Sequence, residues 1–152
     1  MVNEATIVCD LSGSMVECGK RYAMNTVLRT IDQYYRMLNP NVKIRLLGWS
    51  NEIEDLQWGL GDDLPEKLFN CHGSSGVNML ISELGDYLDA PVIILSDGYW
   101  DDPDNEFEGW AESLDDGYMR VILLGADANQ KLDAPFVFNA ESILAALEEF
   151  GD

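Results

Sequence analysis

Residues 5–14 read Ala-Thr-Ile-Val-Cys-Asp-Leu-Ser-Gly-Ser and carry the most structural information in this chain. The first half is a short apolar run, rich in β-branched residues, that stops at Asp10, which is typical of a buried strand. After the Gly/Ser turn, residues 20–38 place apolar side chains at the spacing of one helix face: Met24, Val27, Leu28, Ile31, Tyr34, Tyr35 and Leu38. A buried strand followed by an amphipathic helix predicts an α/β fold.

The same alternation continues to the end of the chain. Further strands are predicted at residues 42–49, 52–58, 91–96, 118–125 and 136–138, and further helices at 64–69, 78–88, 107–114 and 140–150. Ser50-Asn51 separates two of these strands and predicts a hairpin. No linker and no internal repeat interrupts the pattern. We therefore expect residues 1–152 to form one α/β domain, with a mostly parallel central sheet, one antiparallel edge strand and helices on both faces.

The charge of the chain is strongly negative and unevenly distributed. There are 9 Lys and Arg residues against 28 Asp and Glu residues, for a net charge of −19. The first 50 residues hold four acids and six bases, so almost all of the negative charge lies in the remainder. This balance argues against binding to nucleic acid or to an anionic membrane surface. It favours metal cations and basic protein surfaces, although acidic surfaces also serve solubility or adaptation to high salt.

Cysteine usage and the lack of apolar runs bear on location. Cys9, Cys18 and Cys71 are odd in number and irregularly spaced, so they do not form a disulfide framework. The first residues lack the basic and apolar segments of a signal peptide, and no apolar run approaches the roughly 20 residues that span a bilayer. We expect a cytoplasmic protein. A zinc site made of these cysteines and His72 is disfavoured, because buried free cysteine is the commoner state.

Three polar segments are expected to meet where ligand sites form in open α/β sheets, beyond the carboxyl ends of the strands. Residues 10–14 follow the first strand, residues 74–78 open a helix, and Asp97-Gly98 follows the apolar strand at 91–96. Together they offer two carboxylates and several hydroxyls. Such hard oxygen ligands suit Mg²⁺, Mn²⁺ or Ca²⁺. Taken singly, however, these residues are also ordinary turn formers and helix caps.

In this order the segments resemble the von Willebrand factor A (vWA) domain family, which has a Rossmann-like fold. Asp10-x-Ser12-x-Ser14 looks like the metal-ion-dependent adhesion site of that family, and Asp97-Gly98 after Val-Ile-Ile-Leu-Ser looks like its second aspartate motif. Residues 46–51 resemble its second strand and hairpin, and residues 73–80 resemble the Gly-Gly-Thr-Asn turn that opens its third helix. The resemblance runs from Thr6 to Phe150 and so covers nearly the whole chain.

The resemblance implies a non-enzymatic protein-interaction module. Ser12 and Ser14 would bind Mg²⁺, or Mn²⁺ or Ca²⁺, directly, and Asp10 and Asp97 would act through water. A partner's Asp or Glu would complete the coordination. The family's threonine ligand falls on Val77, which has no oxygen to offer, so Ser75 or Asn78 would have to substitute; alternatively, the fold is kept and the metal is lost. Members of this type often work with AAA+ ATPases of the MoxR type.

Two other functions remain open from the sequence. A haloacid-dehalogenase-like, Mg-dependent phosphatase also begins with an Asp at the end of its first strand, but its usual general acid is a second aspartate where this chain has Ser12. A decoy that mimics nucleic acid would use the acidic surface alone. Residues 99–116 hold eight acids and no base, interleaved with Trp100, Phe107 and Trp110. They predict either a rim for a basic partner or a solvated helix whose aromatics pack on the sheet.

Overall fold

The computed structural model describes residues 2–151, and within that range six strands form one sheet in the order β3-β2-β1-β4-β5-β6. The strands are β1 (Glu4–Asp10), β2 (Lys43–Trp49), β3 (Ile53–Leu56), β4 (Val92–Ser96), β5 (Met119–Leu123) and β6 (Val137–Asn139). All neighbouring pairs are parallel except β2 and β3, which form the hairpin at one edge. The expected fold class is confirmed.

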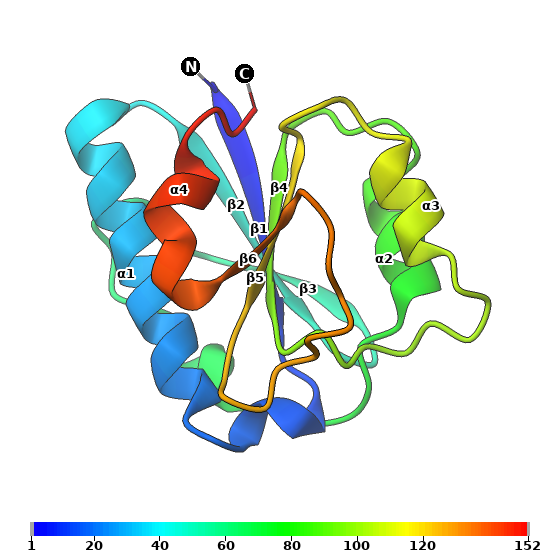
Figure 1. Cartoon of the computed structure of the whole chain (residues 1–152). Helices are drawn as coiled ribbons and strands as arrows, with labels where there is room; N and C mark the ends of the chain where they lie inside the picture. Colours follow the sequence, from blue (N-terminus) through cyan, green and yellow to red (C-terminus); the bar gives the residue numbers. More distant parts are fainter. Residues whose placement is uncertain (1, 152) are drawn as a thin grey trace.

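Helices cover both faces of this sheet (Figure 1). On one side lie α1 (Lys20–Leu38) and α4 (Ile143–Leu147), and on the other lie α2 (Val77–Leu84) and α3 (Phe107–Glu112). Three 3-10 turns, η1 (Gly13–Val16), η2 (Glu66–Phe69) and η3 (Ala140–Ser142), complete the described elements.

Two hydrophobic cores follow from the alternation of side chains along β1. Ala5, Ile7 and Cys9 pack in the core beneath α1 and α4, whereas Val8 faces the core beneath α2 and α3. Both cores run along the sheet, and burying these alternating side chains fixes the register of the central strands. The register in turn sets which residues stand at the carboxyl edge.

The chain changes direction across the sheet at β1. It runs from β1 outward to β2 and β3, then crosses to β4 on the other side of β1 and continues to β6. Ligand crevices open at this kind of switch point. Asp10 is the last residue of β1 and Asp97 directly follows β4, so both expected carboxylates stand at the switch point.

Most expected elements are observed, and the differences lie at their ends. The expected helix at 140–150 is a 3-10 turn followed by a helix that ends at Leu147. Leu144 is more than half exposed, so it does not share the buried face of Ile143 and Leu147. Likewise, the helix expected at 78–88 ends at Leu84, because Gly85 follows with a positive φ of 83°.

Candidate functional site

Asp10 and Asp97 are fully buried, and the backbone around them is folded to hold their carboxylates. Asp10 accepts hydrogen bonds from the backbone N–H of Ser12 (2.9 Å) and from the hydroxyl of Ser96 (2.5 Å). Asp97 accepts one from the backbone N–H of Tyr99 (3.0 Å). Burial raises the pKa of Asp10, and the hydrogen bonds from Ser96 and Ser12 oppose that rise.

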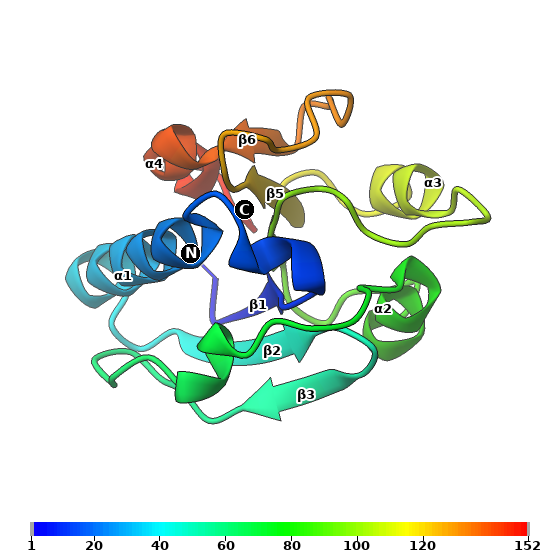
Figure 2. The ribbon, with the colours of Figure 1, turned by 90° about the horizontal axis from the view of Figure 1, so that it is seen from below.

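Ser12 and Ser14 stand together at the mouth of the site, with their Oγ atoms 3.3 Å apart. They line an open hollow of about 440 Å³, whose other walls are Gly73, Ser74, Tyr99, Trp100 and Asp101. Figure 2 looks onto this edge, where the turn after β1 lies between the segment before α2 and the loop that follows β4. The three segments expected from the sequence therefore do meet here.

The segment before α2 is tied to both neighbouring loops. The Gly13 N–H donates to the Gly73 carbonyl (2.9 Å), and the Asp101 N–H donates to the Ser75 carbonyl (2.7 Å). The Trp49 Nε1–H, from the end of β2, donates to the Gly76 carbonyl (2.9 Å). These bonds set the position of the segment that carries Ser75 relative to the loop after β1.

Ser75 is the distinctive residue of this segment. Its hydroxyl is buried and has no hydrogen-bond partner among the described residues. Val77, by contrast, is the first residue of α2 and is buried in the core. Asn78 is exposed and lines an adjoining hollow with Asn51 and other residues, and not the hollow of Ser12 and Ser14. Of the two substitutes considered for the missing threonine, Ser75 is thus the one with an unused buried oxygen.

Lys20, the first residue of α1, is a component of the site that no motif in the sequence indicates. Its side chain is 1% exposed, and its ammonium donates to the Ser14 carbonyl (3.0 Å), to Asp97 Oδ2 (2.9 Å) and to Asp127 Oδ2 (3.1 Å). Burial alone would lower the pKa of Lys20, but the hydrogen bonds and charges of Asp97 and Asp127 outweigh it and raise the pKa. The Lys20 hydrogen bond lowers the pKa of Asp127.

Two sequence signals point to this lysine in hindsight. Asp127 comes shortly after β5, as Asp10 and Asp97 come at the ends of β1 and β4, so it belongs to the same set of strand-end carboxylates. Gly125 precedes it with a φ of +95°, a conformation that favours glycine. A single acid and a single glycine are too common to have identified a partner 107 positions away.

The oxygen donors of this edge fit a hard divalent cation. They comprise the hydroxyls of Ser12, Ser14 and Ser75 and the carboxylates of Asp10 and Asp97. Within residues 2–151, no group of three or more His, Cys, Asp or Glu side chains is placed to hold a metal ion. Any cation bound here would therefore depend on the serine hydroxyls, and the unpaired Ser75 oxygen is the observation in favour of that fit.

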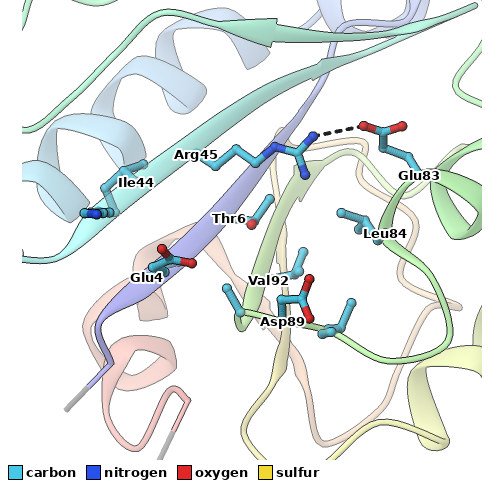
Figure 3. Close-up of a pocket in the computed structure, with 12 residues that line it drawn as sticks. Glu4, Thr6, Ile44, Arg45, Glu83, Leu84, Asp89 and Val92 are labelled. Atoms are coloured by element: carbon cyan, nitrogen blue, oxygen red, sulfur yellow. Dashed lines mark hydrogen bonds and ion pairs between the residues drawn. The ribbon is translucent and has the colours of Figure 1, made fainter.

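A further hollow, of about 330 Å³, lies at the opposite end of the sheet (Figure 3). Its walls come from the first residues of β1, β2 and β4 and from the end of α2 with the loop that follows it. Arg45 spans its rim and pairs with Glu83 (2.9 Å) and with Asp55 (3.0 Å). All three side chains are more than 40% exposed, so this is a solvated ion-pair network.

We expect Arg45→Met to lower the free energy of unfolding by less than about 1 kcal/mol, because exposed ion pairs contribute little and are screened by salt. Urea denaturation at low and moderate salt measures the effect, with Lys43→Met at the same rim as a control for loss of charge. A loss several times larger would mean that Arg45 organises this end of the sheet.

Comparison with known proteins places the fold in a class. No family model matches this sequence, and no curated protein matches it. Solved structures do match: the fold is that of a vWA domain. The SpRpn10 VWA domain superimposes with a TM-score of 0.63 at 11% identity, over 100% of this chain and 98% of that one.

Two further structures show the same fold. An aerotolerance-related membrane protein from Bacteroides fragilis gives a TM-score of 0.62 at 10% identity, covering 97% of this chain and 98% of that one. Proximal thread matrix protein 1 from the mussel byssus gives 0.53 at 15% identity, and this chain spans 46% of its length. At these identities the similarity concerns the fold. No helix within residues 2–151 is both long and apolar enough to cross a membrane.

Proposed function

We propose that this chain is a non-enzymatic protein-interaction module that binds a divalent cation, Mg²⁺ first and Mn²⁺ or Ca²⁺ as alternatives, at the carboxyl edge of its sheet. The observation that carries the proposal is the buried, unpartnered hydroxyl of Ser75, whose chain neighbour Ser74 lines the hollow of Ser12 and Ser14. Leaving a buried hydroxyl unsatisfied costs about 1–3 kcal/mol, and a bound cation would remove that cost.

Each residue has a distinct part in this proposal. Ser12, Ser14 and Ser75 would hold the cation directly, and Asp10 and Asp97 would hold its water ligands. When bound, the cation would attract and bind a partner's carboxylate. The hydrogen bonds from Ser96 and from the Ser12 N–H keep the Asp10 side chain turned toward the site. A partner's Asp or Glu would approach through the open hollow and pass Tyr99, which is half exposed.

The chemistry of the site supports binding over catalysis. A phosphatase of the haloacid-dehalogenase type needs a group that protonates the leaving oxygen, and a serine hydroxyl at position 12 does not supply an acid of suitable pKa. An acidic decoy would need no ordered pocket, so it leaves the buried Asp10–Ser96 pair without a role. The vWA fold of the structural neighbours agrees with an interaction module.

The partner is a protein, and an AAA+ ATPase of the MoxR type is the candidate that the family resemblance suggests. The surface after β4 bears on this choice. Of the two alternatives for the aromatics of residues 99–116, packing holds for Phe107 and Trp110, which are both buried. The acids around them, Asp101, Asp104, Glu106 and Glu108, are exposed. A carboxylate that reaches the cation would therefore have to come from an otherwise basic surface. Three free cysteines suit a cytoplasmic location.

Calorimetric titration of the metal-stripped protein with Mg²⁺ and Mn²⁺ tests the proposal. We expect saturable binding that weakens about tenfold or more in Ser75→Ala and in Ser12→Ala, because each variant removes one cation ligand. Ser74→Ala is the matched control, since Ser74 lines the same hollow but is exposed. Equal weak binding by all four proteins would show that cations collect only on the acidic surface.

The open coordination position has its own readout. Mn²⁺ with an exchangeable water enhances the relaxation of bulk water protons, and acetate is a simple mimic of a partner carboxylate. We expect acetate to reduce the enhancement in the wild type and to leave it unchanged in Ser75→Ala. An enhancement that acetate does not change in the wild type would refute carboxylate capture.

A further inference from the structure

Lys20 joins three loops that are far apart in the sequence. Its ammonium has three protons, and each has an acceptor: the carbonyl of Ser14 after β1, the carboxylate of Asp97 after β4 and the carboxylate of Asp127 after β5. All three distances lie between 2.9 and 3.1 Å. The loops that build the carboxyl edge are thus held by one side chain.

The rest of the fold makes room for this side chain. A Cβ on Gly125 would lie 2.8 Å from Cγ and 2.9 Å from Cε of Lys20, so only glycine lets the aliphatic stem pass. Lys20 begins α1 directly after Gly19, which has a φ of +69°. A glycine thus precedes the backbone of Lys20, and another glycine leaves space for its side chain.

The positive charge of Lys20 compensates buried negative charge at the carboxyl edge of the sheet. Asp10 and Asp97 are both fully buried, and the charge of Asp97 adds to burial in raising the pKa of Asp10. Buried like charges of this kind are unfavourable unless a cation compensates them. In a site organised by a metal, the metal would supply that compensation. Here the ammonium pairs with Asp97 at 2.9 Å and provides a positive charge from within the chain.

We propose that Lys20 is a built-in cation that holds the strand-end loops in place without a metal. A divalent cation is then a ligand of a site that already exists, and Lys20 lowers its affinity by competing for Asp97. The inference deepens the function proposed above, but its first part stands whether or not a metal binds.

Hydrogen exchange of the wild-type protein tests the first part. The N–H groups of Ser12 and Tyr99 donate to Asp10 and Asp97, so they report directly on the site. We expect both groups to be protected already in EDTA, and Mn²⁺ to add only the increment that ligand binding gives by mass action. Protection that appears only with Mn²⁺ would overturn the proposal, because the loops would then depend on the metal.

Lys20→Met tests the second part, since methionine keeps most of the stem and removes the charge. We expect this variant to bind Mn²⁺ at least about tenfold more tightly than the wild type, because a nearby positive charge is gone. Its melting temperature should be lower in EDTA and should rise more with Mn²⁺ than that of the wild type. If Lys20→Met and the wild type bind Mn²⁺ equally tightly, and their melting temperatures rise equally with Mn²⁺, the competition for Asp97 is refuted.

The double variant Lys20→Met/Asp97→Asn keeps the result interpretable. It removes both charges of the pair, so we expect it to fold in EDTA without help. If Lys20→Met stays unfolded with Mn²⁺ while the double variant folds, a metal does not replace the ammonium and the competition is refuted. If neither folds, removing both charges does not restore the fold, and charge compensation by Lys20 is refuted. A wild type that binds no Mn²⁺ but is protected in EDTA refutes the metal function and leaves the role of Lys20 intact.

Discussion

Replacing Asp97 with alanine is expected to lower the free energy of unfolding by about 3–5 kcal/mol in EDTA. Asp97 is fully buried and pairs with the ammonium of Lys20, which is itself 1% exposed. The variant leaves that ammonium in a low-dielectric site with Asp127, which is 44% exposed, as its remaining carboxylate partner. Breaking one side of a buried pair costs far more than the pair contributes when intact. Urea denaturation followed by circular dichroism measures the loss.

Two variants separate the charge from the shape of the side chain. Asp97→Asn keeps an acceptor oxygen for Lys20, so its loss should be smaller. Lys20→Met/Asp97→Ala removes both partners, and its loss should be less than the sum of the two single losses. Strictly additive losses would mean that the ion pair does not couple the two loops.

Replacing Trp49 with alanine is expected to cost about 3–5 kcal/mol in the free energy of unfolding, the usual range for emptying a large core site. Trp49 is fully buried at the end of β2, and its ring lies 5.9 Å from that of Trp100, measured between centroids. It also donates its Nε1–H to the Gly76 carbonyl, next to Ser75. The same change should therefore weaken cation binding at Ser75. Urea denaturation and Mn²⁺ titration of one sample measure both effects.

Trp58→Ala is the matched control for this double effect. Trp58 is also buried and donates its Nε1–H to a backbone carbonyl, that of Asp62, but it packs in the other core. We expect a comparable loss of stability with unchanged Mn²⁺ affinity. Equal effects of both variants on Mn²⁺ binding would show that the loss follows from general loosening and not from the support of Ser75.

The elements of the fold are predictable from the sequence because their signals are local. The helical spacing of apolar residues gives α1 with both ends as observed, Lys20 and Leu38. The apolar runs give the strands, and their abrupt stops at Asp10 and Asp97 place the two carboxylates at the correct edge. Where an end depends on tertiary packing, as in the helix that stops at Leu147, the prediction overran.

The hydrogen bonds and ion pairs of the site were not predictable, because they join residues that are distant in the sequence. The hydroxyl of Ser96 donates to Asp10 across 86 positions, and Lys20 reaches Asp97 across 77. A lysine at the start of a helix ordinarily points to solvent, and no single-sequence pattern distinguishes the buried exception. The choice between Ser75 and Asn78 likewise needs the position of the whole segment relative to Gly13.

The spread of the site along the chain has a consequence for folding. Its loops follow β1, β4 and β5, so the site exists only when these three neighbouring strands are paired at once. No fragment that lacks one of them can display it, and an opening of any one strand dismantles it. A ligand of this edge therefore binds only the assembled sheet. By mass action, such a ligand raises the population of fully folded chains relative to partly folded ones.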